Sequence, residues 1–589
     1  NGAAIKNFII NKEKSSFSKS VFTLCGYRKE DKCPPWSIQS SKLLHDSVKK
    51  TLYYDNAVIK VYDIPIFYFP RLSHPDPSVE RRSGFLPPSI YDTKNLGAGV
   101  SVPYFFDLGN DKNLTLSSRL YLTENPLFLG EYHQAFKNSN FLTDFGYTEG
   151  YKRSSSSKKA GEKSHLFSKF IKNFKGKNNS DNTLDLTLQQ VSNDKYLKLY
   201  KIKSNLVDFN RDTLENSIEF TRETEGGFLG LNASVFETLK GSYTDKHEYI
   251  LPEIIFDKNL FNDDSFGTLD LQTNLKIHNY DTNKLSNFLI NDLDWQSKEL
   301  YSKSGFKTQI LANFKNINYE TKNIDQYKED NTYELYGALG FLTKLDFRKK
   351  QNSFEHLLTP KMFLRSSPGS MRFETSGARL NPLNAFSLDR LDNKNNYETG
   401  ISGTLGLDYK IKNKEKEFDF SVAQVINEKE NNKMADITSL NEKLSDLVGT
   451  FGYSVSDKFK LNYNFSLDQN YQDLNYNEIA TKVNYGALNF NFNYLQEKKH
   501  IGNQDYFTTK LNIKNKQNGL FSFENKRNLI TNSSEFYNLS YEYINDCLRA
   551  GLVYRREFYN DSELEPENSL MFKITLTPFG SINSPTFSK

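Results

Sequence analysis

The sequence has no long apolar run. No segment of its 589 residues approaches the ~18 consecutive apolar residues that a membrane-spanning helix requires. The opening residues 1–14 also lack the apolar core of a signal peptide. These two absences exclude a helical membrane protein and an intact secretory leader at this end of the chain. The chain starts at Asn1 without a methionine, so we expect either that a signal has been removed or that the chain is a fragment of a longer protein.

The sequence also lacks a large excess of positive or negative charge. The chain has 76 basic and 72 acidic residues, for a net charge of +4, and it carries no RNA- or DNA-binding motif. We therefore predict no nucleic-acid partner.

Residues that could build a catalytic or metal site are sparse. The eight histidines are dispersed, and no two have the i, i+4 spacing of a helical metal site. The segment His74–Pro77 is read as a rigid turn because its prolines are so dense. The glycine-rich pieces, such as Gly97–Gly99, lack the strand–loop–helix setting of a phosphate cradle. We expect no enzyme activity, no catalytic residue, no metal and no cofactor.

Aromatic residues and alternation are what the sequence does contain. It has 46 Phe and 35 Tyr but only 2 Trp, and Phe and Tyr favour strands. Apolar and polar residues alternate strictly in many short runs, which gives a strand one apolar and one polar face. The clearest runs are Phe459–Asp468, Leu488–Tyr494 and Tyr537–Tyr543, with weaker ones at Leu114–Leu122, Leu184–Leu188, Leu269–Ile277, Leu405–Ile411 and Phe507–Ile513.

This alternation favours a membrane β-barrel over a soluble sheet protein. The polar members are mostly Asn, Lys, Asp and Ser, which suits a polar lumen, while the apolar members suit lipid. The region from about Gly84 to Thr577 is long enough for about two dozen strands at ~20 residues per strand and loop. The first 80 residues differ, with short strands at Trp36–Gln39, Thr51–Tyr54 and Val58–Val61 and then a proline-rich stretch, Ile64–Pro77, predicted to be a stiff linker.

Specific landmarks resemble one family. The segment Ile64–Pro88, IPIFYFPRLSHPDPSVERRSGFLPP, is similar to the barrel entry of the LPS-assembly proteins of the LptD (OstA or Imp) family. Further landmarks agree in order, namely Cys25, Trp36, His45-Asp46, Asn56-Ala57, Val102–Phe105, Leu129–Tyr132, Leu358–Lys361, Asn384–Tyr409, Asp546-Cys547 and Tyr554–Arg556.

The resemblance implies an all-β fold. Residues 1–80 are expected to be the last part of a periplasmic β-jelly-roll (β-taco) domain and its linker, and residues 81–589 a large transmembrane antiparallel β-barrel of about two dozen strands, with 26 expected. Most of the periplasmic domain is expected to be missing from this chain.

The resemblance also implies a function and partners. The protein is expected in the outer membrane, where it receives lipopolysaccharide from the periplasmic bridge protein LptA and inserts it into the outer leaflet. The plug lipoprotein LptE, the barrel-assembly machinery and outer-membrane lipids are the other expected partners. A porin or substrate-specific channel is the alternative; an outer-membrane enzyme or a soluble adhesin are weaker rivals.

The cysteines permit three pairings, of which only one can form at a time. Closing a barrel brings the chain ends together, so Cys25–Cys547 and Cys33–Cys547 are both feasible, as is a local Cys25–Cys33 bond. The resemblance favours Cys25–Cys547.

Prolines mark a predicted lateral gate. Pro87 and Pro88 lie in the first barrel strand and Pro103 in the second, and proline cannot donate to a strand ladder. By resemblance, Pro88 and Pro103 weaken the seam between the first strand and the closing strand, which we expect at Ser569–Thr577.

Arg81 and Arg82 precede that first strand. They are interpreted as markers of the membrane boundary, with contact to LPS phosphates as the alternative.

Overall fold

A computed structural model describes residues 2–587, apart from residues 12, 26–33, 77, 80, 87–88, 94, 155–159, 210, 241–244, 376, 392, 500–502, 516–517, 531–532, 546, 558–566 and 577–579. Most of the described chain is strand. No helix in the described part is long and apolar enough to cross a membrane.

Two sheets contain all of the strands. The N-terminal sheet has the order β1 (Gly2–Asn11), β2 (Lys14–Phe22), β3 (Trp36–Asp46), β4 (Thr51–Val61) and β5 (Ile64–Pro75). The barrel contains β6 (Gly84–Phe85), β7 (Ser89–Thr93), β8 (Gly97–Gly109), β9 (Lys112–Tyr121), β10 (Leu127–Ala135), β11 (Ser139–Gly150), β12 (Ala160–Lys175), β13 (Asp181–Val191), β14 (Thr213–Thr224), β15 (Gly227–Thr238), β16 (His247–Asp263), β17 (Gly267–Tyr280), β18 (Lys284–Gln296), β19 (Leu300–Tyr301), β20 (Phe306–Lys322), β21 (Thr332–Leu345), β22 (Phe347–Gln351), β23 (Phe354–Ser367), β24 (Gly400–Lys412), β25 (Lys416–Asn427), β26 (Leu447–Val455), β27 (Phe459–Leu467), β28 (Leu474–Tyr485), β29 (Leu488–Glu497), β30 (Gln504–Lys514), β31 (Gly519–Asn528), β32 (Ser533–Ile544), β33 (Leu548–Glu557), β34 (Glu567–Leu576) and β35 (Gly580–Phe587).

Helices are few and short. They are α1 (Tyr196–Leu199) and the 3-10 turns η1 (Lys177–Asn179), η2 (Asn384–Phe386) and η3 (Asp436–Thr438). The predicted all-β fold class is therefore confirmed, and each alternating run of the sequence lies in a strand, from Leu114–Leu122 in β9 to Tyr537–Tyr543 in β32.

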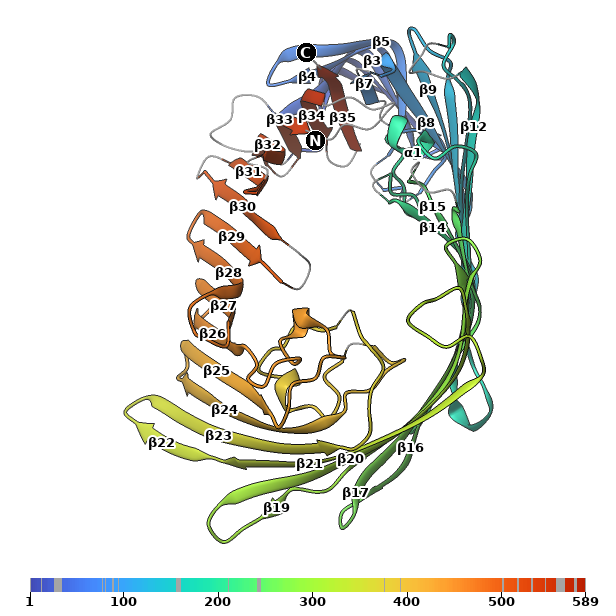
Figure 1. The fold of residues 1–589 in the computed structure, drawn as a ribbon. Coiled ribbons are helices and arrows are strands. Elements are labelled where there is room, and N and C mark those ends of the chain that lie inside the picture. The colour runs from blue at the N-terminus through green and yellow to red at the C-terminus, as the bar shows by residue number, and fades with distance from the viewer. Residues whose placement is uncertain are drawn as a thin grey trace.

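The barrel is an antiparallel meander that closes on itself (Figure 1). The elements β7, β19 and β22 pair with the same neighbours as β6, β18 and β21 and continue those strands. The described residues then form 27 strands, one more than the 26 expected. The extra strand is β35, so the predicted closing strand, Ser569–Thr577, is wrong: it corresponds to β34, which pairs with β33 and β35.

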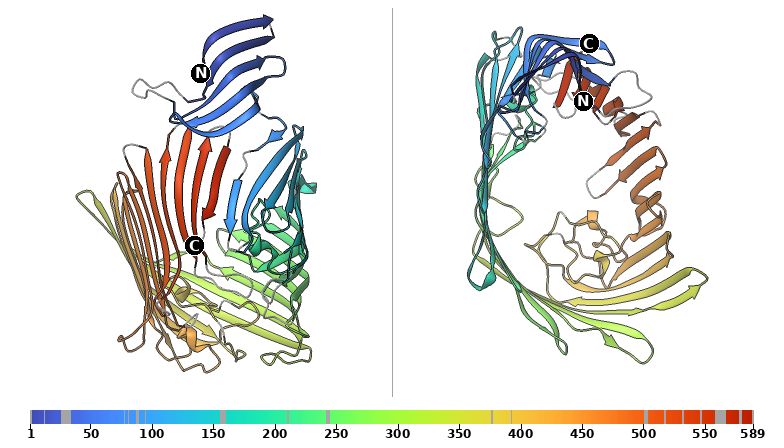
Figure 2. Two further views of the ribbon diagram at one scale, coloured as in Figure 1. Left: turned by 90° about the horizontal axis from the view of Figure 1, so that it is seen from above. Right: turned by 180° about the vertical axis from the view of Figure 1, so that it is seen from behind.

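An odd number of strands has a geometric consequence. In an antiparallel meander, the first and last of 27 strands run in the same direction. Figure 2 (left) agrees, since the red strand at the end of the barrel and the neighbouring blue strand both point away from the N-terminal sheet. Parallel pairs are slightly less stable per residue than antiparallel ones, so the closure differs from every other strand contact of the barrel.

The two faces of the barrel wall meet different surroundings. In β23, the side chain of Phe363 points inward and is 0% exposed, whereas its neighbour Leu364 points outward and is 49% exposed. On β29, the face with Asn491, Asn493 and Glu497 is the inner one, because Glu497 pairs with Arg379 of a loop inside the barrel. The aromatic members of β29, including Phe492, therefore point outward.

The N-terminal sheet lies on one end of the barrel, called here the sheet end; the opposite end is the far end (Figure 2, left). The separate strands predicted in this region merge into β3 and β4, and the predicted linker Ile64–Pro77 is wrong over most of its length because Ile64–Pro75 forms β5. β5 is the edge strand of the sheet, a position where prolines are tolerated because their missing N–H can lie on the side that has no neighbouring strand.

The outward face of the barrel generates a stability prediction. Replacing the outward-facing Phe492 with Arg should lower the free energy of unfolding in a lipid bilayer by ~2–4 kcal/mol, because the guanidinium would have to enter lipid. The matched change at the adjacent inward-facing residue, Asn493→Arg, should have a much smaller effect. Denaturant titration of both variants in phospholipid vesicles measures the difference, and equal losses would contradict a membrane-facing outer wall.

Candidate functional site

Three long connections at the far end fold back into the barrel. They are the β13–β14 loop (residues 192–212), the β23–β24 loop (368–399) and the β25–β26 loop (428–446). Figure 1 shows the first beside β14 and β15 and the other two beside β24 and β25. We call them inner loops. Connections of this length are uncommon in compact folds and are usually functional when they are ordered.

The β23–β24 and β25–β26 loops bury an apolar cluster against the inner wall. Met371, Leu380 and Phe386 of the first loop and Met434 and Leu440 of the second belong to this cluster. The wall contributes its own apolar side chains, which are Phe363, Ala423, Val425 and Val448. The lumen is therefore partly filled by the chain itself at this side.

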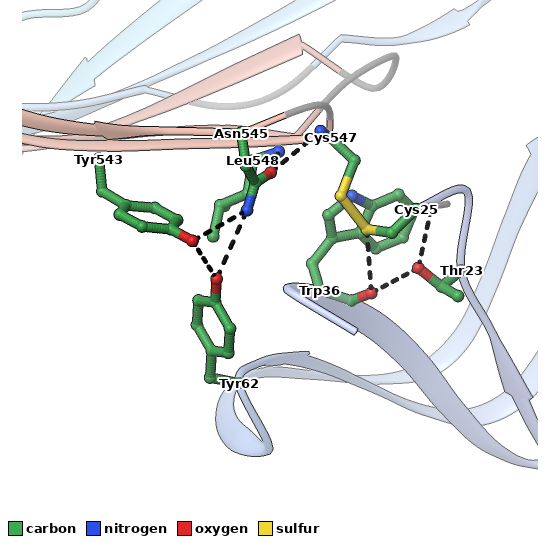
Figure 3. The surroundings of a disulfide bond; sticks show 8 residues. All are labelled: Thr23, Cys25, Trp36, Tyr62, Tyr543, Asn545, Cys547 and Leu548. Carbon is green, nitrogen blue, oxygen red and sulfur yellow. Dashed lines mark hydrogen bonds between the residues drawn. A yellow bond between two sulfur atoms is a disulfide. The ribbon is translucent and has the colours of Figure 1, made fainter. Parts of the chain in front are cut away.

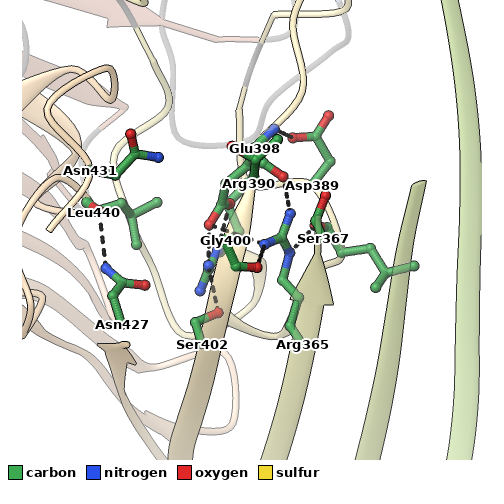
Figure 4. Close-up of polar contacts among 12 residues, drawn as sticks. Arg365, Ser367, Asp389, Arg390, Glu398, Gly400, Ser402, Asn427, Asn431 and Leu440 are labelled. Carbon is green, nitrogen blue, oxygen red and sulfur yellow. Dashed lines mark hydrogen bonds and ion pairs between the residues drawn. The ribbon is translucent and has the colours of Figure 1, made fainter. Parts of the chain in front are cut away.

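A buried ion network fixes the β23–β24 loop (Figure 4). The Arg390 Nε donates to Glu398 Oε2 at 2.8 Å, and the Arg390 Nη2 contacts the other carboxylate oxygen and donates to Ser402 Oγ at 3.0 Å. Arg365 of β23 also approaches Glu398 and donates to the backbone carbonyls of Leu388, Glu398 and Gly400.

Burial and the neighbouring arginines shift the pKa of Glu398 in opposite directions. Burial by itself raises the pKa of Glu398, but Arg365 and Arg390 more than compensate and hold its pKa below the ordinary value. Glu398 therefore remains ionised inside the protein. Burial raises the pKa of the neighbouring Asp389, an effect that Lys315 opposes from β20 at 3.3 Å.

The β13–β14 loop is held by a second network. Tyr196, Leu197 and Ile202 are buried in an apolar cluster against the wall. The Arg119 Nη1 of β9 donates to the Tyr200 carbonyl oxygen at 2.6 Å, and the His165 Nε2 contacts the Asp144 carboxylate at 2.6 Å. These contacts position the loop beside the strands that follow the start of the barrel.

A disulfide joins the N-terminal sheet to the end of the barrel (Figure 3). Cys25 is bonded to Cys547, 522 residues further along the chain, in the turn between β32 and β33. The pairing that the resemblance favoured is therefore confirmed. Cys33 lies outside the described residues. Both bonded cysteines are buried in one apolar cluster with Phe22, Trp36 and Leu548.

Polar contacts support the same junction. The Tyr62 and Tyr543 hydroxyls are 2.7 Å apart, and the Asn545 Nδ2 lies 3.4 Å from each of them (Figure 3). The turn that carries Cys547 is thus anchored to the sheet by a covalent bond, an apolar cluster and a hydrogen-bonded tyrosine pair.

Arg81 and Arg82 lie between the two sheets and contact one each. Arg81 donates to the backbone carbonyls of Asn110 and Lys112 in the β8–β9 turn and forms an ion pair with Asp107 at 3.2 Å. Arg82 donates to the Lys49 carbonyl at 3.1 Å and contacts Thr51 in the N-terminal sheet. Their described contacts are thus to protein groups at the boundary between sheet and barrel.

His74 occupies the core of the N-terminal sheet. Its Nδ1 is 2.7 Å from the Pro75 carbonyl oxygen, which can only accept, so Nδ1 carries the proton and Nε2 accepts from the Tyr54 hydroxyl at 2.7 Å. Burial lowers the pKa of His74, although Pro75 and Asp76 favour the charged form. His74 is part of this packed core, beside Tyr54 and Phe22.

The first barrel strand is interrupted. In the residues that the structure describes, it pairs with β8 over two residues in β6 and five in β7, and the register shifts by one residue between these pieces. Pro103 of β8 lies opposite the interruption, where its carbonyl accepts from the Leu86 N–H at 2.9 Å. In an antiparallel ladder both backbone groups of a residue face the same neighbour, so the missing Pro103 N–H is a bond lost to the first strand.

The structure thus gives a position for only one of the three predicted gate residues. Pro103 lies beside the first strand, while Pro87 and Pro88 lie outside the described residues. Among the residues that the structure describes, no group of three His, Cys, Asp or Glu side chains is arranged to hold a metal ion.

The inner loops were missed by the sequence reasoning. A signal was present, because the period-two alternation stops between Ser367 and Gly400 although the segment is too long for a hairpin turn. Acidic and basic residues inside that segment, such as Arg390 and Glu398, could have been recognised as candidates for buried pairs.

A large closed β-barrel with inner loops and a sheet attached to one end is the architecture of an outer-membrane β-barrel protein. The comparison with known families makes this specific. The family model "LptD: LPS transport system D" matches residues 170–522, more than half of the chain, and the protein belongs to this family.

Curated relatives carry the same family name. The chain is 35% identical over 127 residues to the LPS-assembly protein LptD of Francisella tularensis subsp. holarctica, covering 20% of this chain and 14% of the relative. It is 34% identical over 119 residues to that of Paraburkholderia xenovorans, covering 20% of this chain and 15% of the relative. It is 32% identical over 130 residues to that of Cupriavidus metallidurans, covering 22% of this chain and 15% of the relative. The aligned segments therefore span only a small part of each relative.

The buried network of the β23–β24 loop leads to a prediction. Glu398→Ala should destabilise the loop by ~3–5 kcal/mol, because it leaves the buried Arg365 and Arg390 without their carboxylate. Limited proteolysis from the far end should then cleave within residues 368–399. The control Glu355→Ala removes a partly exposed ion pair with Lys412 and should leave the loop protected. Equal protection in both variants would show that the network does not hold the loop.

His74 leads to a pH prediction. Because its folded pKa lies below its unfolded value of about 6.5, the unfolded chain binds the proton more readily. The stability of the N-terminal sheet should be full above about pH 6.5 and should fall as the pH decreases toward the lowered folded pKa. The fluorescence of Trp36, which packs in the same cluster, can follow unfolding between pH 8 and pH 5. His74→Gln should flatten this dependence; an unchanged slope would assign it to other groups.

Proposed function

We propose that this protein transports lipopolysaccharide into the outer leaflet of the outer membrane. The N-terminal region, residues 1–80, acts as the periplasmic receiving domain, and residues 81–589 form the translocating barrel. The sugars of LPS pass through the lumen while the acyl chains leave sideways between the first and last strands. This transport requires no catalytic residue and no cofactor of the protein itself.

The interrupted first strand is the observation that carries this proposal. Seven of its described residues pair with β8, and Pro103 has no N–H for a further bond. Its other neighbour is the parallel strand β35. Each missing hydrogen bond removes roughly 0.5–1.5 kcal/mol of net pairing, so this strand is the easiest part of the wall to displace. Pro87 and Pro88, in the gap between β6 and β7, are proposed to be part of the same gate.

The position of the N-terminal sheet supports the same route. Its edge strand β5 leads directly to the first barrel strand, and Ile64 and Tyr68 on β5 are 67% and 59% exposed. Exposed apolar side chains suit contact with acyl chains. The disulfide and the Arg81 and Arg82 contacts hold this sheet in place beside the seam.

The partners are proposed from the family. A periplasmic bridge protein such as LptA would deliver LPS to the sheet, and the lipoprotein LptE would occupy lumen space that the inner loops leave. The barrel-assembly machinery would insert the barrel, and outer-membrane lipids would surround it.

A cross-link tests the gate. One cysteine introduced in Ser89–Thr93 and one in Gly580–Phe587 should join the first and last strands when oxidised and stop the appearance of LPS at the cell surface. The control pair Ile254→Cys and Leu275→Cys joins directly opposed residues of β16 and β17 and should leave export unchanged. Normal export through a verified cross-link at the seam would exclude a lateral gate, as expected for a porin.

A further inference from the structure

The inner face of β27–β31 carries an unusual group of lysines. The contacts of Arg379 identify this face, because Arg379 lies inside the barrel and meets both Tyr476 of β28 and Glu497 of β29. By alternation, Lys482 points inward from β28, and the pairing registers place Lys460 and Lys510 on the same face of β27 and β30.

These lysines form one row across neighbouring strands. Lys460 is directly opposite Lys482, Lys482 is opposite Asn491, and Asn491 is opposite Lys510. The row ends at Glu524 of β31, which Lys510 approaches at 3.9 Å. We call Lys460, Lys482, Asn491 and Lys510 the lysine row.

The Lys460–Lys482 pair is unfavourable as it stands. Directly opposed residues have Cβ atoms ~4.5–5.5 Å apart, and like charges at that position destabilise a sheet. In the described part of the chain, neither ammonium has a carboxylate within ion-pair distance. Other inward lysines do: Lys315 meets Asp292 at 3.1 Å, and Lys361 meets Asp408 at 2.8 Å. Lys460 and Lys482 therefore carry charge that no ion pair of the described wall neutralises, and Glu417 acts on Lys460 only from a longer distance.

The row lines a cavity of about 440 Å³. Amides and hydroxyls surround the ammonium groups there, among them Asn462, Asn493 and Thr508. A second amide chain runs along the wall, since the Asn491 Nδ2 donates to Asn489 Oδ1 at 3.0 Å and Asn489 in turn donates to Asn484. Ammonium groups suit phosphate oxygens, and side-chain amides and hydroxyls suit sugar hydroxyls.

The inner loops reach β27–β29 only near the far end. Arg379 meets Tyr476 and Glu497 there, and Ser466 donates to Asp446. The lysine row lies toward the sheet end of the same strands, close to the β26–β27 and β28–β29 turns, and the described apolar clusters of the inner loops include no residue of β27–β31.

We propose that the lysine row is a binding site for a phosphorylated sugar, with Lys460 and Lys482 sharing the phosphate and the surrounding amides contacting the sugar. The identification of that sugar as the headgroup of a transported glycolipid rests on the proposed function. Free inorganic phosphate has the same anionic chemistry and is the alternative source.

The test uses the full chain in detergent with its disulfide intact. The probe is a fluorescently labelled, deacylated LPS oligosaccharide that retains its phosphates, and fluorescence anisotropy measures its affinity. The double variant Lys460→Gln with Lys482→Gln should bind at least tenfold more weakly. Its melting temperature should equal or exceed that of the parent protein, because the like-charge repulsion is gone. The matched control Lys307→Gln removes an inward lysine that is already paired with Asp346 at 2.7 Å and should keep full affinity.

Two comparisons separate the alternatives. The same oligosaccharide after phosphatase treatment should bind the parent protein no better than the double variant does. Equal affinity of parent and double variant for the phosphorylated probe would overturn the site. Inorganic phosphate and the unlabelled phosphorylated sugar are then compared as competitors of the labelled probe. If inorganic phosphate displaces the probe at the same concentration as the phosphorylated sugar does, the assignment to a glycolipid is overturned. Binding is measured without export, so normal export through the cross-linked seam would reject the proposed gate and leave this result standing.

Discussion

Each strand of a closed barrel must satisfy two different surroundings with side chains that alternate along one backbone. The backbone groups are used up by the neighbouring strands, and closure leaves no edge. The sequence of a strand can therefore vary only in which side chains point into the lumen and which point outward. In β29 this yields aromatic residues outside and asparagines inside, and the same constraint decides where loops can enter and where the wall can open.

That constraint explains how much was predictable. Alternation is local, so strands such as β27, β29 and β32 could be located from the sequence alone. The inner loops were not predictable in the same way, because they make the inner face apolar where they pack. Ile317 and Tyr319 of β20 point inward and are nearly fully buried beneath Tyr397 and its neighbours, so the alternation that reveals a strand is weakened where an inner loop covers it.

The way in which the barrel closes also could not be predicted from the alternation of apolar and polar residues. β34 alternates well and resembles a last strand, but nothing in its own sequence states whether another strand follows. The register shift between β6 and β7 likewise depends on how both pieces meet β8. The Cys25–Cys547 bond was anticipated from family resemblance only, since composition left three pairings open. The sequence pattern therefore predicted the strands of the wall, and the family resemblance predicted the Cys25–Cys547 junction. The seam and the loops in the lumen could be located only in the folded structure.

The remaining irregularities are concentrated in two parts of the wall. Around the inner loops, buried charges are matched closely: Glu398 has Arg365 and Arg390, and Asp389 has Lys315. Such matching suits a part of the molecule that stays fixed, because each unpaired charge there would be costly. On β27 and β28, Lys460 and Lys482 face each other without an ion-pair partner among the described residues, and the described part of the first barrel strand is only partly paired. Natural sheets avoid both arrangements when stability alone is selected, and departures from consistent local rules are expected at functional sites. The barrel therefore divides into a wall that the inner loops brace from within and a second part, which contains the lysine row on β27–β30 and the seam at the closure.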